Sequence, residues 1–343
     1  MTLFWHGHFA TGADKVMDAR AMFRQNQLLR KHSLGLYEPF VKQISRDVAM
    51  LIYLDSEENR KTRPNENYAR ELMELFCLGP GNYTERDIKE VAKCFTGWEV
   101  QRSRFGFNEH QHDKSTKSFL GANGNFDGND AIEVVLKQPA ASQFIAKKLI
   151  RFFVFDDEEI TDQFAAPIAN QLRDSNFNIR DAVKTILSSN VFFSDVAIAK
   201  KIKSPVELAV GFLRFFDAST NINQLGQHLA AIGQLPLYPP NVKGWVGGRS
   251  WINASTILAR ANLITGILSN DKTKFKDGNL ETWAKANSEH EITNSLAWVD
   301  EYLLATPLSN QTKRAFEEIS NKQNRDPAKV LGWVAALPEF QLN

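Results

Sequence analysis

The sequence predicts a mainly α-helical protein, organised as a single large multi-helix domain with a minor β-hairpin or extended element around residues 97–113. Apolar residues recur with a period near 3.6 in most segments, which is typical of amphipathic helices. Residues that favour helix ends, such as Ser, Thr, Asp, Pro and Gly, flank these segments. Strand signals are few and short, so little β structure is expected.

The N-terminal part predicts three helices. Residues 14–32 carry apolar residues at helical spacing, and residues 35–54 form a second such segment that ends in an apolar run. A polar connection then reaches Pro64, a residue that favours a boundary. Residues 64–79 predict the third helix.

The β element is predicted between two groups of helices. Thr84 and Asp87 resemble a capping pair that begins a helix at 85–95. Residues 96–113 alternate well enough for two short strands or an extended loop. Gly and Asn fill residues 120–130, which indicates turns.

Helical patterns then continue to about residue 268, and the last seventy residues predict weaker, more polar helices. The predicted segments are 130–138, 140–155, 159–175, 178–189, 204–216, 227–233 and 254–268. Because no break in composition marks a boundary, we predict a main helical domain at 1–268 with a C-terminal helical extension at 269–343 packed on it.

Composition excludes several classes of function. The 343 residues include 41 Lys and Arg against 40 Asp and Glu, so charge gives no support for nucleic-acid binding. No apolar run reaches the ~18 residues of a membrane span, and the first residues lack the basic leader and apolar region of a signal peptide. Walker loops, GxGxxG, GxSxG and HExxH motifs are absent, which counts against nucleotide binding and common serine hydrolases. Cys77 and Cys94 are predicted to be buried thiols.

Histidines provide the first candidate site. Four of the seven form two His-x-His pairs, His6 with His8 and His110 with His112. In an extended segment, residues two apart point to the same side, so each pair can offer two imidazoles to one ion, and Asp113 can add an oxygen. This donor set suits zinc, iron or manganese. The alternative is that the first pair packs among aromatic residues and the second lies in an exposed loop.

The predicted helix at 64–79 provides the second candidate site. Glu66, Arg70 and Glu74 share one face, and Glu71 lies one position round. One interpretation is a row of exposed ion pairs, which stabilise little. The other is that apolar residues around the helix partly bury a carboxylate, which then requires a partner or a proton.

A Pro- and Gly-rich segment at 238–251 provides the third candidate site. It offers Asn241, Lys243 and Trp245, and Trp98 lies in the predicted β element. Aromatic rings beside polar groups suit a sugar, whose apolar face stacks while its hydroxyls are hydrogen-bonded. The alternative is a rigid loop fixed to the core by its Trp side chains.

Six blocks of the sequence resemble, in this order, those of the large bacterial domain-of-unknown-function 1800 family: FWHGHF, PNENYARELMELFCLG, YTERDIKEVAKCFTGW, HDKSTKSFLG, KSPVEL and GQLPLYPPNVKGW. The resemblance covers Met1 to Asn262, and the family name assigns no reaction. It implies export, to the periplasm or the exterior, and a further helical region ahead of the first block. The polar and aromatic residues that the blocks share are His6, His8, Asn65, Glu66, Arg70, Glu71, Glu74, Trp98, His112, Asp113, Lys117, Lys203, Glu207, Asn241 and Trp245.

These patterns support a metal-dependent, hydrolase-like enzyme as the first hypothesis. A divalent transition metal would lower the pKa of a bound water. The predicted ligands are His6, His8, Glu71, His112 and Asp113, and the predicted catalytic groups are Glu66, Arg70 and Glu74.

The competing hypothesis is a non-catalytic protein that binds a glycan or an exported protein partner. Its predicted contact residues are Trp98, Lys117, Asn241, Lys243 and Trp245. A third interpretation is a buried polar network that contains no site.

Overall fold

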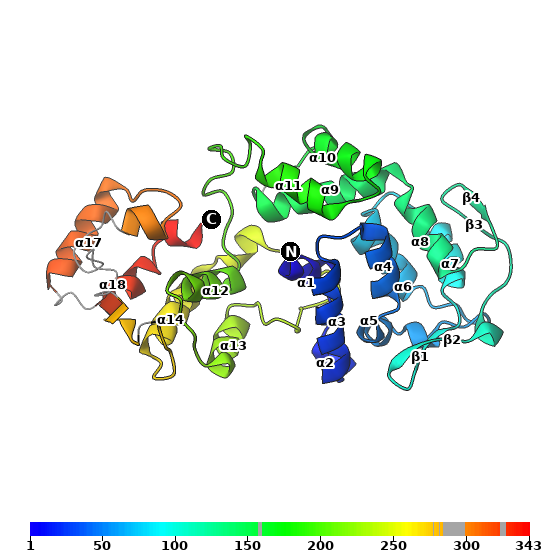
Figure 1. Ribbon diagram of the computed structural model, residues 1–343, viewed down its shortest axis with the longest axis horizontal. Coiled ribbons are helices and arrows are strands. Elements are labelled where there is room, and N and C mark those ends of the chain that lie inside the picture. The colour runs from blue at the N-terminus through cyan, green and yellow to red at the C-terminus, as the bar shows by residue number, and fades with distance from the viewer. Residues whose placement is uncertain (157–159, 277, 281, 284–298, 323–326) are drawn as a thin grey trace. The chain divides into compact units, whose positions relative to one another are not determined.

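The computed structural model describes residues 1–156, 160–276, 278–280, 282–283, 299–322 and 327–343 (Figure 1). As predicted, the described chain is mainly α, with small antiparallel sheets of two strands each. It divides into two compact units. Unit 1 comprises residues 1–153, 158–189 and 236–245, and unit 2 comprises 154–157, 190–235 and 246–343. The division into 1–268 and 269–343 stays a prediction.

Unit 1 contains the helical elements of the N-terminal half. They are α1 (Thr2–His8), α2 (Ala13–Val16), α3 (Ala19–His32), α4 (Tyr37–Ser45), α5 (Val48–Tyr53), η1 (Ser56–Glu58), α6 (Asn67–Glu71), η2 (Leu72–Cys77), α7 (Glu85–Cys94), η3 (Glu109–Gln111), α8 (Gly128–Leu136), α9 (Pro139–Phe153), α10 (Asp162–Asp174) and α11 (Ile179–Leu187). In Figure 1, α9, α10 and α11 lie side by side, and they also contact one another in the structure.

The β element lies where the sequence predicted it. Strands β1 (Trp98–Gln101) and β2 (Arg104–Phe107) form an antiparallel pair. A second pair, β3 (Lys117–Phe119) and β4 (Ala122–Gly124), was not predicted, because the turn residues around it hide three-residue strands.

Two of the predicted helices are each divided by a capping aspartate. The segment at 14–32 breaks at Met17, which adopts a left-handed conformation, and Asp18 then caps α3 by accepting from two backbone N–H groups. The segment at 35–54 breaks where Asp47 accepts from the Met50 N–H and begins α5. A helical period cannot reveal such breaks, because apolar spacing continues across them.

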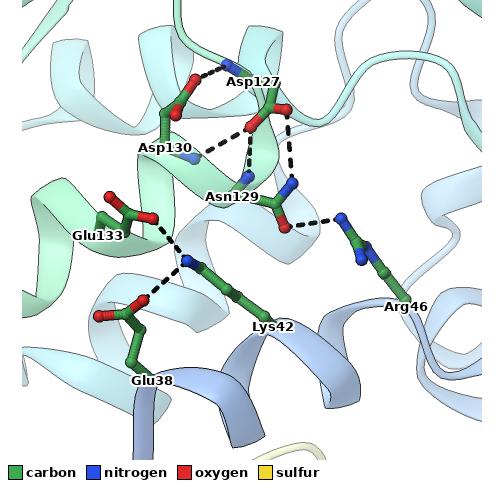
Figure 2. Close-up of polar contacts among 7 residues, drawn as sticks. All are labelled: Glu38, Lys42, Arg46, Asp127, Asn129, Asp130 and Glu133. Carbon is green, nitrogen blue, oxygen red and sulfur yellow. Dashed lines mark hydrogen bonds and ion pairs between the residues drawn. The ribbon is translucent and has the colours of Figure 1, made fainter.

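Charged side chains join α4 to α8. Figure 2 shows Lys42 between the carboxylates of Glu38 and Glu133, at 2.7 and 2.6 Å. Burial lowers the pKa of Lys42, but the hydrogen bonds to Glu133 and Glu38 outweigh it and raise this pKa above its ordinary value. One turn further along the chain, Arg46 donates to Asn129 Oδ1 at 2.7 Å (Figure 2).

The core of unit 1 around α1 is aromatic. Trp5 of α1 and Phe9, which directly follows that helix, are fully buried, and they pack against Tyr37 and Phe40 of α4. The Trp5 indole N–H donates to the carbonyl of Ser33 at 2.9 Å, so this buried donor is satisfied. The two rows of rings fix α1 against α4.

Unit 2 contains α12 (Pro205–Phe215), α13 (Ile222–Ala231), η4 (Gly248–Trp251), α14 (Ala254–Ser269), η5 (Val299–Leu303), α17 (Asn310–Lys322), α18 (Pro327–Val334) and η6 (Glu339–Gln341). Arg260 of α14 is fully buried, and it donates to Gln341 Oε1 at 2.6 Å and to the Lys203 carbonyl at 2.7 Å. Lys203 donates to the Phe340 carbonyl at 2.9 Å. These bonds attach the C-terminal residues to the start of α12. Within the described ranges, every helix falls short of the length and apolarity that crossing a membrane would require.

Candidate functional site

A π-helix interrupts the predicted helix at 64–79. Element η2 follows α6 directly and widens by one residue per turn, so that the Leu78 N–H donates to the Met73 carbonyl, five residues back, at 2.9 Å. π-Helical turns are rare, and they are frequently found at functional sites. Glu71 and Glu74, two of the predicted site residues, lie at and within this turn. The sequence carries no signal for it.

A buried polar network supports the C-terminal end of η2. The Tyr37 hydroxyl donates to the Phe76 carbonyl at 2.6 Å, and the Lys148 ammonium donates to the Leu75 carbonyl at 3.0 Å. Carbonyls at the end of a helix have no partner within it, so these two side chains replace the missing donors. Without them the wide turn would leave buried acceptors unsatisfied.

His8 lies between the two supporting side chains. Its Nε2 is 2.8 Å from the Tyr37 hydroxyl and its Nδ1 is 3.0 Å from the Lys148 Nζ. Because the Tyr37 proton goes to Phe76, Nε2–H of His8 donates to the Tyr37 oxygen, and Nδ1 accepts from Lys148. Both nitrogens of His8 are therefore engaged within the protein.

Burial sets the charge of this network. Burial and then the Lys148 charge hold the pKa of His8 well below its ordinary value, and burial lowers the pKa of Lys148 to about 7. Part of the Lys148 side chain still reaches the surface. The sequence analysis missed Lys148, because one lysine in the amphipathic segment 140–155 looks like an ordinary exposed residue.

Glu71 and Glu74 form a carboxylate pair with polar neighbours. The Tyr83 hydroxyl donates to Glu74 Oε2 at 3.1 Å, and Lys243 Nζ lies 3.8 Å from Glu74 Oε1. Burial, followed by the charge of Glu74, raises the pKa of Glu71, and Lys243 and Arg70 oppose that rise. Burial and the bond to Glu74 raise the pKa of Tyr83 to about 12. Glu71 therefore keeps its proton to a higher pH than an ordinary glutamate does.

Segment 236–245 reaches back to α1. His6 Nε2 accepts from the Leu237 N–H at 2.9 Å, and the His6 ring lies 5.5 Å from the Trp245 ring. Gly244 has φ +73°, and a Cβ built on it would lie 2.3 Å from the Gly7 carbonyl oxygen. Only glycine permits this approach, so two distant sequence blocks meet backbone to backbone.

His6 is neutral in this arrangement. Burial lowers its pKa to about 4, and because Nε2 accepts a hydrogen bond, the proton lies on Nδ1. Within the described part of the chain, that Nδ1 and the Trp245 Nε1 are buried without a hydrogen-bond partner.

Glu66 and Arg70 form a separate ion-pair group near the surface. Arg70 donates to both oxygens of Glu85 at 2.8 Å and to Glu66 at 3.3 Å. The hydrogen bonds from Arg70 to Glu85 raise the pKa of Arg70. Solvent screens such pairs, so they fix the start of α6 more than they stabilise the fold.

The loop after the β1–β2 hairpin holds a further group of predicted residues. His112 Nδ1 lies 2.9 Å from the Thr96 carbonyl, and the Asp113 N–H donates to the Thr96 hydroxyl at 2.8 Å. Lys117 is fully buried, and its ammonium donates to the Asp113 carbonyl and to Asn125 Oδ1. Trp98 is 4% exposed. Since Trp98 and Lys117 are both enclosed, neither offers a face to a ligand in this structure.

The five predicted metal ligands are not assembled. His6 and His8 lie on the helix α1, not on an extended segment, so residues two apart point to different sides and the premise of the first His-x-His pair is wrong. The acceptor nitrogens of both are already engaged, and within the ranges that the structure describes no group of three or more His, Cys, Asp or Glu could hold an ion.

The structure brings together Glu71, Glu74 and Lys243, and it brings His6 to Trp245. Asn241 is exposed, and its Oδ1 accepts from the Lys243 N–H at 2.9 Å, which shapes the turn that carries Lys243. Cys77 and Cys94 are buried free thiols, as predicted.

Comparison with known proteins identifies a family. The family model described as "Protein of unknown function (DUF1800)" matches residues 1–342, so the likeness extends beyond the predicted limit at Asn262. No match was found among curated proteins or among solved structures.

Proposed function

The chain belongs to the DUF1800 family, whose description assigns no reaction, and we propose that unit 1 is an acid–base enzyme of the hydrolase type. Its reacting groups are the carboxylates of Glu71 and Glu74. The observation that carries the proposal is that burial and a neighbouring carboxylate raise the pKa of Glu71, while Glu74 faces a hydroxyl donor and an ammonium. Carboxyl groups in unlike environments divide the acid and base roles between them.

The proposed reaction needs both groups. Glu74, oriented by Tyr83 and Lys243, removes a proton from the attacking water, and Glu71 gives its proton to the leaving group. The water oxygen forms the new bond, the bond to the leaving group breaks, and the two carboxyls have exchanged their protonation states. Exposed Asn241 and Lys243 are the proposed contacts for a polar, uncharged substrate such as a glycan or an ester.

Hydrolysis of 4-nitrophenyl glycosides and esters between pH 4 and pH 8 tests this proposal. We expect Glu71→Gln and Glu74→Gln each to lower kcat by roughly 100-fold or more, the usual contribution of a general acid or base. Glu71→Gln should also remove the loss of activity at high pH, because that loss reports deprotonation of the acid. Glu85→Gln, which breaks the ion pair with Arg70 nearby, is the matched control.

Retention of full turnover in both carboxylate variants would contradict the proposal. Binding of a glycan by the unaltered protein without any turnover would favour the non-catalytic function, for which Trp245→Ala is the corresponding variant. Zinc or manganese can also be added to the protein. A rise in its melting temperature would support the hypothesis of a metal-dependent enzyme.

A further inference from the structure

Unit 1 contains a cavity of about 600 Å³, between the start of α3 and the beginning of segment 236–245. This volume falls within the range of small-molecule sites. The lining is mainly apolar and includes Met17, Asp18, Met22, Phe23, Leu237 and Tyr238.

Large apolar side chains at this cavity are exposed to solvent. Met17 is 85% exposed and Phe23 is 64% exposed, and Tyr238 is about half exposed. Exposed apolar groups that gather around a concavity mark a binding site more often than single ones on a flat surface. Methionine also adapts its shape to a partner, since it is unbranched and flexible.

Two positions in the cavity wall have unfavourable backbone conformations. Met17 has φ +49° and Leu237 has φ +69°. Residues other than glycine, Asn and Asp rarely adopt this left-handed region. Leu237 is held there at both ends: its N–H donates to His6, and its carbonyl accepts from the Ala13 N–H at 2.8 Å. Backbone strain of this kind is concentrated at functional sites and ligand clamps.

The charge of the lining is negative. Asp18 supplies the one acidic side chain among the lining residues, and burial lowers the pKa of His6, the one basic side chain among them. Both of its helix-capping hydrogen bonds go to Oδ1. Asp18, Phe23 and Tyr238 line the same cavity, and a carboxylate together with aromatic rings attracts a cation and repels an anion.

From this geometry we propose that the cavity binds a small molecule with an apolar body and a cationic amine end. The apolar body fills the space between Met17, Met22 and Leu237, and the amine faces Asp18. This site does not depend on the reaction proposed for Glu71 and Glu74.

Titration calorimetry at pH 7 with three probes of one shape tests the proposal: 4-phenylbutylammonium, 4-phenylbutanol and 4-phenylbutanoate. We expect the ammonium to bind at least 10-fold more tightly than the carboxylate, with the alcohol between them. Asp18→Asn keeps the helix cap, because Asn caps as well as Asp, and it should abolish the preference for the cation.

Filling the cavity is the second arm of the experiment. Ala19→Trp places a large ring at the exposed first residue of α3 and should lower the affinity for the ammonium at least 10-fold, whereas Ala140→Trp, near the start of α9, should not change it. If Ala19→Trp fails to fold, Phe23→Ser is the alternative variant, because it removes an exposed apolar side chain from the cavity lining. No heat of binding up to 10 mM ammonium, equal affinity for the carboxylate, or unchanged binding in both cavity variants would each overturn the proposal.

Discussion

The His6 imidazole accepts a hydrogen bond from the backbone of Leu237, 231 positions later in the chain. The bond fixes segment 236–245 against α1 and holds Leu237 in its left-handed conformation. It requires an unprotonated Nε2, so it links the state of one buried imidazole to the position of a distant loop.

Acid should destabilise the protein through His6. Its pKa is about 4 in the folded protein and 6.5 ordinarily, so between these values the unfolded chain binds the proton more strongly. Stability from this group is complete above pH 6.5 and is lost as the pH falls to 4, by about 3 kcal/mol at ~1.4 kcal/mol per pKa unit. Urea unfolding between pH 4 and pH 7 measures it.

His6→Gln isolates this effect, because an amide oxygen can accept from Leu237 and does not titrate. The difference in unfolding free energy between the wild type and His6→Gln should change with pH in that window. His110→Gln, at an exposed histidine, should follow the wild type. Parallel profiles for all three proteins would show that folding does not lower the pKa of His6.

Alkali should stabilise the protein through Lys148. Its pKa is about 7 when folded, below the ordinary 10.5, so the unfolded chain holds the proton more strongly between these values. Stability should therefore rise as the pH increases from 7 to 9. Lys148→Met should lower stability, because it leaves His8 Nδ1 and the Leu75 carbonyl without their donor, and it should flatten this rise.

Lys147→Met is the matched control for Lys148. Lys147 is the preceding residue of α9 and pairs with Asp162 at the surface, so its replacement should change stability little and leave the pH dependence intact. If Lys147→Met and Lys148→Met gave the same profile between pH 7 and pH 9, the network beneath η2 would not control it.

Gly244→Ala should displace segment 236–245. The alanine would have to adopt the left-handed φ of Gly244, which costs about 1–2 kcal/mol. Its Cβ would also collide with the Gly7 carbonyl oxygen, which adds about 1–3 kcal/mol. Chemical denaturation measures the sum. Gly81→Ala is matched in backbone angle, at φ +85°, but meets nothing within 4 Å, so only the first cost applies. Equal losses in the two variants would argue against close packing of the two blocks.

Local features of this protein follow from the sequence. Thr84 with Asp87 forms the predicted capping box of α7, and the β1–β2 hairpin occupies the predicted segment. Both depend on residues a few positions apart, whose mutual geometry the backbone fixes. The sequence also predicted the carboxylates of the 64–79 segment as site residues from their local spacing, and that role stays a prediction.

The tertiary structure alone decided the rest. The π-helix at Leu72–Cys77 exists together with Tyr37 and Lys148, which satisfy its last carbonyls, and neither is a sequence neighbour. His6 and His8 do not form the predicted pair on one side of an extended segment, because α1 is helical and because Leu237 and Lys148 engage their nitrogens. The physical reason is that a side chain's charge and hydrogen-bond state depend on burial and on partners, which the fold brings together from distant parts of the chain.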